Sequence, residues 1–214
     1  MKHQNTFTPD SSAPTHEKGI RCLDQLALIT YGDTATLRCG LVSAYDAKFA
    51  SAVDRLDKLT PGWTNTAAGL RAGIDLLRGA PRGLRLRLWL LSDGKANIDV
   101  GQIMPQVARA RKSWININAI GFGDPQEYDA AALKAIAAGT HNGKFMTAHT
   151  AEKLGSVMKG AAGRRGRMTK GEATVFVIDA SGSMFFQKMD GRQRMKVVKS
   201  AMFSLIKYKQ QMWS

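Results

Sequence analysis

A carboxylate and two hydroxyls follow an apolar run near the end of this sequence. Asp179, Ser181 and Ser183 come directly after the run 175–178, which is typical of a strand buried on both faces of a parallel sheet. Gly182 allows a tight turn between the two serines. Carboxylate and hydroxyl oxygens are hard ligands, so their spacing indicates a loop that holds Mg²⁺. The same residue types also form ordinary helix N-caps, which is the alternative interpretation.

Two further turns carry oxygen ligands. Thr64 precedes a helix predicted over 67–77, and Asp93 follows a strand predicted over 84–91. In parallel α/β sheets, ligands bind where the strands reach their carboxyl ends. We therefore expect the loops that carry Asp179, Thr64 and Asp93 to meet around one cation.

Alternating strand and helix patterns position these loops. Two strands over 26–31 and 35–41 indicate a hairpin at a sheet edge. The whole pattern predicts an α/β fold, a Rossmann-like three-layer sandwich with a mostly parallel central sheet, one antiparallel edge strand and helices on both faces. Trp89 and Trp114 lie in strand patterns and are predicted to be in the core. The other predicted strands are 84–91, 114–120, 144–147 and 175–178, and the predicted helices are 47–59, 67–77, 103–112, 130–138, 151–160 and 193–213.

The motif Asp-Ala-Ser-Gly-Ser over 179–183 resembles the metal-ion-dependent adhesion site of von Willebrand factor A (vWA) domains. In that family, the Asp-x-Ser-x-Ser motif is joined by a Thr from a second loop and an Asp from a Thr/Ser-Asp-Gly turn. Thr64 and Asp93 match these two parts, whereas Trp63 stands where many members have glycine.

The resemblance implies a role for each of these side chains. Asp179 would hold Mg²⁺ directly or through water, and Asp93 would act mostly through water. Mn²⁺ and Ca²⁺ are the alternative ions. The hydroxyl oxygens would come from Ser181, Ser183 and Thr64, and the rim that meets a partner would consist of Trp63, Asn65, Gly94 and Met184.

The order of the elements differs from the family's order. There the Asp-x-Ser-x-Ser strand and its helix come first, whereas here they come last, over 174–214. This arrangement is similar to a circular permutation. We therefore predict a mobile polar tail over 1–20 and a single permuted vWA domain over 21–214, with 162–173 linking the ancestral ends. A slice across two tandem domains and a strand-swapped dimer are the alternatives to a permuted monomer.

The resemblance implies binding rather than turnover, because an ion with few anionic ligands can accept a carboxylate from an Asp or Glu of a partner protein. A second resemblance, carried by 179–184, 192–199 and 92–97, is to the vWA domain of magnesium chelatase D subunits, which work with AAA+ ATPases. The chain contains no Walker loop, so such an ATPase would be a separate protein. We expect no enzyme, because Asp179 lacks the second acid of an Asp-x-Asp loop and no Ser/His/Asp set has an evident spacing.

The charge of the chain favours a different function class as the alternative. Its 31 Lys and Arg residues against 17 Asp and Glu give a net charge of +14, which could bind nucleic acid through phosphates. Few aromatic residues accompany the basic run 164–170, so base stacking is not indicated. No apolar run is long enough to span a bilayer, and the first residues lack the apolar core of a secretory signal. Two cysteines make no disulfide framework, which favours a cytoplasmic protein.

Overall fold

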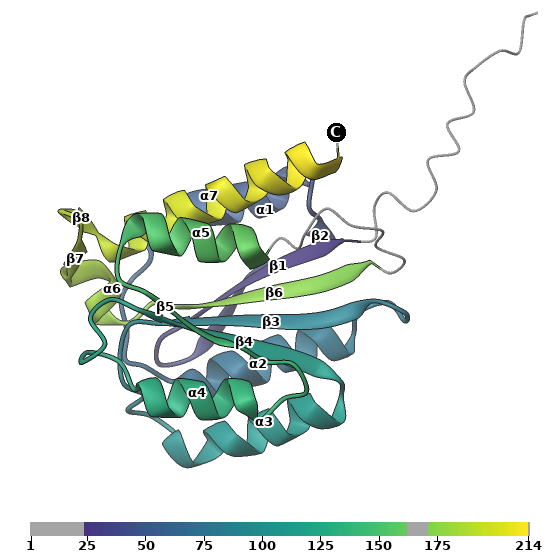
Figure 1. The fold of residues 1–214 in the computed structure, drawn as a ribbon, viewed down its shortest axis with the longest axis horizontal. Coiled ribbons are helices and arrows are strands. Elements are labelled where there is room, and N and C mark those ends of the chain that lie inside the picture. Colours follow the sequence, from purple (N-terminus) through teal and green to yellow (C-terminus); the bar gives the residue numbers. More distant parts are fainter. Residues whose placement is uncertain (1–23, 162–170, 214) are drawn as a thin grey trace, which may run out of the picture.

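The computed structural model describes residues 24–161 and 171–213. The predicted tail over 1–20 and most of the predicted linker over 162–173 lie outside the described residues. In the described part, a six-stranded sheet lies between two layers of helices (Figure 1). This is the mostly parallel α/β sandwich that the sequence predicts.

Six strands make up the central sheet: β1 (Gln25–Tyr31), β2 (Ala35–Ser43), β3 (Arg85–Ser92), β4 (Ile115–Phe122), β5 (Phe145–Ala148) and β6 (Glu172–Asp179). Their order across the sheet is β2-β1-β6-β3-β4-β5. Neighbours pair in parallel except β1 and β2, which form the predicted antiparallel hairpin at the edge. Strand β6 is the last of these in the sequence, yet it lies in the middle of the sheet with every residue buried.

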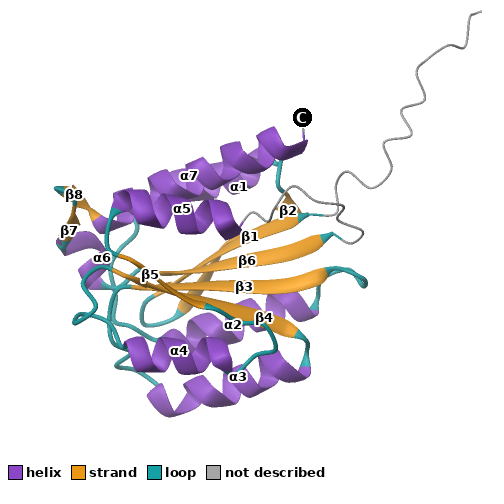
Figure 2. Ribbon diagram, viewed as in Figure 1, coloured by secondary structure: helices purple, strands orange, loops and turns teal. Residues whose placement is uncertain are grey.

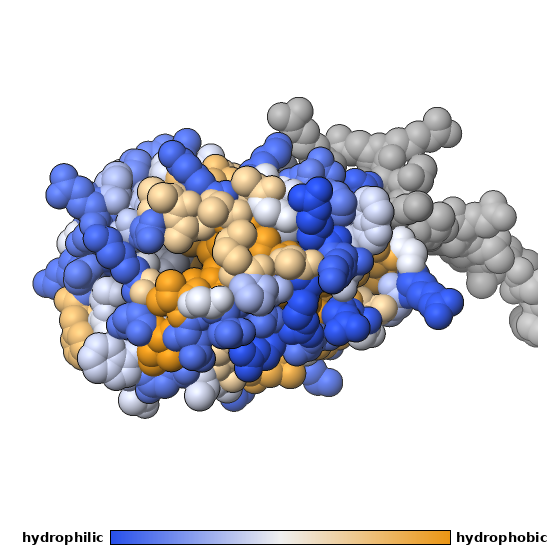
Figure 3. All heavy atoms as spheres, turned by 90° about the horizontal axis from the view of Figure 1, so that it is seen from below, coloured by the Kyte–Doolittle hydropathy of each residue, from blue (hydrophilic) through white to orange (hydrophobic). Residues whose placement is uncertain are grey.

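Two helical layers cover the sheet (Figure 2). One face carries α1 (Ala47–Asp54), α5 (Ala151–Ala161) and α7 (Arg194–Trp213), and the other carries α2 (Thr66–Arg78), α3 (Ile103–Lys112) and α4 (Ala130–Ala138). Because strand side chains alternate between faces, the core divides into two clusters, one under each layer. Seen from the side of α3 and α4, hydrophilic residues surround a smaller central area of hydrophobic ones (Figure 3). Within the described ranges, none of the helices has the length and apolar character needed to cross a membrane.

Helix α2 packs closely on the middle of the sheet. A Cβ at Gly69 would lie 2.9 Å from the Tyr31 ring and from Val177, and a Cβ at Gly73 would lie 2.6 Å from Leu88. Only glycine permits this approach without a shift of the neighbouring side chains. The two glycines therefore hold the start of α2, and the loop before it, against the carboxyl ends of β1 and β6.

The end of α7 lies beside the amino ends of β1 and β6, away from the candidate site. Lys209 Nζ of α7 lies 2.9 Å from Asp24 Oδ2, and the Glu172 backbone N–H donates to Asp24 Oδ1 at 3.0 Å. The Lys209 side chain is buried, so its charge needs the Asp24 carboxylate as a partner. This contact ties the C-terminal helix to the first described strand.

Several local predictions are corrected by the structure. The predicted helix over 47–59 is split into α1 and a 3₁₀ turn (Leu56–Lys58). Between β6 and α7, the sequence analysis missed a short helix, α6 (Gly182–Phe186), and a small ribbon of β7 (Lys188–Met189) and β8 (Arg192–Gln193). These elements are too short to produce a hydrophobic period.

The prediction that Trp114 belongs to the core is wrong. Trp114 lies just before β4 at φ 56°, and its side chain is 73% exposed. Its ring stacks on His141, with the ring centroids 4.2 Å apart. Trp89, by contrast, is buried as predicted. The alternating pattern of β4 starts one residue later than the sequence analysis placed it, so Trp114 falls in the turn after α3.

Candidate metal site

The loops that follow β6 and β3 bring their polar side chains into contact. The Ser183 hydroxyl donates to Asp93 Oδ1 at 2.7 Å, and the hydroxyl oxygens of Ser181 and Ser183 are 3.1 Å apart. Thr64 lies beside them, because a Cβ placed at Gly94 would be 3.7 Å from Ser183 Oγ and 3.8 Å from Thr64 Oγ1. The structure thus brings together oxygens from three segments that are far apart in the sequence.

Backbone hydrogen bonds fix the loop before α2 against the loop after β6. The Gly62 N–H donates to the Ala180 carbonyl at 3.2 Å, and the Gly182 N–H donates to the Gly62 carbonyl at 3.0 Å. Two polar side chains complete this loop: the Trp63 N–H donates to Asp33 Oδ1 at 2.8 Å, and the Thr64 N–H donates to Asn97 Oδ1 at 3.0 Å. The position of Thr64 is therefore set by backbone hydrogen bonds at Gly62 and by the side chains of Asp33 and Asn97.

Asp179 ends β6 as a fully buried carboxylate. Its Oδ2 accepts hydrogen bonds from the Ser92 hydroxyl at 2.8 Å and the Tyr31 hydroxyl at 3.2 Å, and its Oδ1 accepts from the Ser181 N–H at 2.9 Å. No described cationic side chain forms an ion pair with it. Burial, followed by the nearby Asp93 carboxylate, raises the pKa of Asp179 from its ordinary value of 3.8 to about 7. The carboxylate is thus solvated by neutral donors and lacks a compensating charge.

Asp93 differs from Asp179 because a cation contacts it. Arg194, at the start of α7, lies 3.0 Å from Asp93 Oδ2 and also contacts Glu127 and Gln187. Burial raises the pKa of Asp93, although the hydrogen bonds from Ser183 and Arg194 oppose the shift. Both Asp93 oxygens therefore already have partners, and Arg194 offsets much of the charge that Asp93 would offer to an ion.

The sequence analysis missed several residues that support the site. Arg194 was noted only within the run 192–199 and was given no role, because a basic residue at the start of an amphipathic helix is commonplace. Asp33 falls between the two strands of the predicted hairpin and was given no role, and Tyr31 was only the last residue of the first of these strands. The place of Tyr31 at the end of a mostly apolar strand could have indicated it, and in the structure Tyr31 pairs with Asp179.

The predicted rim is partly wrong. Met184 is fully buried in the core under α7, and the side chain of Asn65 is buried as the N-cap of α2, where it accepts from the Ala68 N–H. Trp63 is 66% exposed as a rim residue requires, and Gly94 is half-buried. Phe186 of α6, 78% exposed, was missed. Trp63 and Phe186 line a cavity of about 490 Å³, together with Asp33, Pro61, Gly62, Thr64, Asn97, Ser181, Gly182 and Ser183.

The fold and this cavity define an α/β domain with an oxygen-rich site at the carboxyl edge of its sheet. The family model for the von Willebrand factor type A domain matches residues 20–160, so the chain belongs to the vWA family. The family resemblance predicted from the sequence is thereby confirmed. The match ends before β6, the strand that carries Asp179.

Two solved structures, with TM-scores of 0.50 and 0.51, show the same fold. The von Willebrand factor type A protein from Catenulispora acidiphila is 19% identical over 58% of this chain and 30% of its own, with a TM-score of 0.50. Proximal thread matrix protein 1 from the mussel byssus is 26% identical over 64% of this chain and 33% of its own, with a TM-score of 0.51. A second structure of the mussel protein, described as having a zinc occupied MIDAS motif, is 28% identical over 58% and 31%, with a TM-score of 0.45. The chain spans about a third of the length of these proteins. The comparison with curated proteins gave no match.

The uncompensated charge of Asp179 predicts a pH-dependent stability in the metal-free protein. A carboxyl whose pKa rises on folding favours the folded state at low pH, and this contribution is lost as the pH rises from about 4 to about 7. In EDTA at pH 8, we expect Asp179→Asn to raise the free energy of unfolding by about 1–4 kcal/mol, and this difference should disappear near pH 4. Urea unfolding across this pH range measures it.

A surface carboxylate provides the control for this prediction. Asp75→Asn removes a charge whose only described ion pair is the exposed one with Arg109, so its effect should stay below about 1 kcal/mol at every pH. Equal stability of wild type and Asp179→Asn at pH 8 in EDTA would contradict the burial argument.

Proposed function

We propose that this chain is a metal-dependent protein-binding module, in which a divalent cation at the Asp179 site accepts a carboxylate from a partner protein. The observation that carries the proposal is that Thr64, Ser181 and Ser183 line one cavity, while Ser183 donates to Asp93 and the Ser181 N–H donates to Asp179. Membership of the vWA family supports it, because the resemblance noted in the sequence implies this kind of site.

The residues fit a hard divalent cation. Asp179 has a buried negative charge that no described cationic side chain neutralises, and an ion would do so. No cluster of three or more His, Cys, Asp or Glu side chains with metal-binding geometry occurs among the described residues. Ligation would therefore rest on Asp179 and on the hydroxyls of Ser181, Ser183 and Thr64, a donor set suited to Mg²⁺, with Mn²⁺ or Ca²⁺ as alternatives.

The contact between Arg194 and Asp93 supports an open, electrophilic ion. An Asp93 that already accepts from Arg194 and Ser183 suits an indirect role through water, so Asp179 would be the main anionic ligand. An ion with one direct carboxylate retains affinity for another. The partner's Asp or Glu would supply that oxygen, and apolar side chains beside it would contact the exposed rings of Trp63 and Phe186.

We also propose that the domain is circularly permuted. The family match ends at residue 160, while β6, between β1 and β3, supplies the strand and the Asp-x-Ser-x-Ser motif that the family places first. The contacts of Asp24 with Lys209 and Glu172 support this, because they show that the end of α7 lies beside the start of β1. In the ancestral order β1 would follow α7 directly, so a permutation requires the end of α7 and the start of β1 to lie close together.

The finer expectations stay predictions. They are the kinship to magnesium chelatase D subunits, a separate AAA+ ATPase as partner, a cytoplasmic location, the lack of enzymatic activity, and a monomer as opposed to a swapped dimer. A binding role needs none of them.

Metal binding is tested with Mn²⁺, which electron paramagnetic resonance detects when free. We expect one Mn²⁺ per chain, displaced by Mg²⁺. Ser183→Ala should weaken the affinity about tenfold or more, and Asp179→Ala should abolish binding. Ser51→Ala, which removes an exposed hydroxyl on α1, is the matched control and should bind as wild type does. Unchanged Mn²⁺ binding by Asp179→Ala would place the ion elsewhere.

The partner's chemistry is tested by selecting a random peptide library on the immobilised protein in Mg²⁺ and eluting with EDTA. The recovered peptides should share one Asp or Glu with an apolar neighbour, and replacing that acid with Asn or Gln should abolish binding. Trp63→Ala should weaken the best peptide by about tenfold, because the exposed indole is expected to be a hot spot. Recovery of peptides without any acid would contradict the carboxylate bridge.

The permutation is tested by reordering the chain, so that residues 171–213 precede 24–161 through a short glycine-serine linker. If the ancestral order is compatible with this fold, the reordered chain should show the same far-UV circular dichroism and the same Mn²⁺ stoichiometry. A matched control places 171–213 after 24–161 through the same linker. Failure of the reordered chain alone would show that the present order is required.

A further inference from the structure

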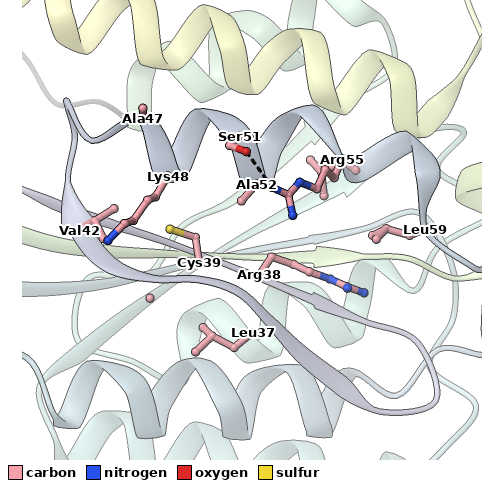
Figure 4. Close-up of a pocket in the computed structure, with 12 residues that line it drawn as sticks. Leu37, Arg38, Cys39, Val42, Ala47, Lys48, Ser51, Ala52, Arg55 and Leu59 are labelled. Carbon is pink, nitrogen blue, oxygen red and sulfur yellow. Dashed lines mark hydrogen bonds between the residues drawn. The ribbon is translucent and has the colours of Figure 1, made fainter.

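A groove separate from the metal site runs between the edge strand β2 and helix α1 (Figure 4). Its volume is about 860 Å³, and it shares no lining residue with the cavity around Ser183. A Cβ placed at Gly40, on its β2 side, would meet no atom within 4 Å, which shows how open the groove is.

The groove follows the open edge of β2. Residues 37–40 of β2 line it, in a stretch where the pairing of β2 with β1 has two register shifts. The regular alternation of side chains is interrupted there, and the groove lies between this stretch of the edge strand and α1. No other strand in the described part of the chain pairs with β2 on its outer side, and this nine-residue strand contains no proline. Its backbone is a template for one further strand.

The walls of the groove are basic. Arg38 of β2, Lys48 of α1 and Arg55, the residue directly after α1, line it, and none of the lining residues is acidic. Within the described ranges, none of these three side chains forms an ion pair. Arg38 Nε donates to Thr30 Oγ1 at 2.8 Å, and Arg55 donates to Ser51 Oγ at 3.0 Å. The hydrogen-bond partners of the two arginines are thus neutral hydroxyls. Figure 4 shows Lys48 toward one end of the groove and both arginines toward the other.

Apolar side chains lie between these charges. Leu37 is 56% exposed, and Val42 and Leu59 are half-buried along the same groove. An occupant would thus need acidic residues to meet the three cations, apolar residues between them, and an extended backbone to pair with the edge.

We propose that this groove is a second docking site, which takes an acidic extended segment of a partner protein as an added strand on β2. Main-chain hydrogen bonds to β2 would provide affinity, and the charges of Arg38, Lys48 and Arg55 would select acidic side chains. A nucleic acid fits less well, because no aromatic side chain lines the groove for base stacking. A second copy of this chain also fits less well, because each copy carries a net charge of +14 and would set cations against cations.

The test uses a fluorescein-labelled ten-residue peptide of alternating Glu and Val, measured by fluorescence anisotropy in EDTA. EDTA removes any contribution of the metal site, so failure here and failure of the proposed function are distinguishable. We expect saturable binding, and we expect the double variant Lys48→Glu/Arg55→Glu to weaken it roughly tenfold or more. Lys48 and Arg55 are both exposed, so the variant should fold, which circular dichroism verifies.

Three controls make the proposal falsifiable. Arg71→Glu, on the exposed face of α2, changes the net charge without touching the groove and should bind as wild type does, allowing for a factor of about two from the overall charge. A peptide of alternating Lys and Val should not bind. The acidic peptide with every second backbone nitrogen methylated keeps its side chains but cannot pair as a strand, and it should lose at least tenfold in affinity.

Other outcomes overturn the proposal. Equal binding of the methylated peptide would show charge attraction without strand addition. Equal binding by Lys48→Glu/Arg55→Glu would place the peptide outside the groove. Light scattering that reports a dimer of the free chain, converted to a monomer by Arg38→Pro in the middle of β2, would assign the edge to a second copy.

Discussion

The insertion of β6 between β1 and β3 is the interaction on which the rest of the structure depends. Without it, the sheet would be two separate pieces, β2-β1 and β3-β4-β5, with their inner edges unpaired. Its register sets Asp179 beside Tyr31 and Ile178 beside Leu91. The same pairing therefore completes the hydrophobic core and places the Asp179 carboxylate next to the turn that contains Ser92 and Asp93. Fold and candidate site share one constraint, although the strand that satisfies it is the last of the sheet to appear in the sequence.

Asp179 and Asp93 have different surroundings, and this difference affects how each could bind an ion. Asp179 is surrounded by neutral donors, the hydroxyls of Tyr31 and Ser92 and one backbone N–H, which solvate a charge without neutralising it. Asp93 is neutralised by Arg194, which α7 brings from the far end of the chain. A site with two equal, unpaired acids would hold a divalent ion tightly and leave it with little remaining attraction for a third carboxylate. A site with one unpaired acid keeps that attraction.

Much of this arrangement could be predicted from the sequence, because periodicity reports the large elements well. The bounds of α3 and α4 agree with the predicted 103–112 and 130–138, and the hairpin of β1 and β2 lies at the predicted edge. The errors fall where structure is local or side chains act across distance. Trp114 was misplaced because strand patterns do not mark their first residue. Met184 and Asn65 were given to the surface because a motif gives the order of residues, and the direction of each side chain depends on packing. Arg194 and Tyr31 were missed because their partners lie on other elements.

The metal site and the basic groove are joined through the turn between β1 and β2. Asp33 of that turn accepts from the Trp63 N–H at the site, and β2, which lines the groove, begins two residues later. On the two proposals, both surfaces would select carboxylates, one through a bound ion and the other through Arg38, Lys48 and Arg55. If a single partner segment reached both, the second contact would form at the high local concentration that the first creates, and two weak interactions would give one strong one. The net charge of +14 would act before either contact, by attracting acidic partners from a distance at low ionic strength. The metal would then serve for selectivity as much as for affinity, because the cations of the groove accept any acidic strand, whereas the ion accepts only a carboxylate that reaches it at the correct position.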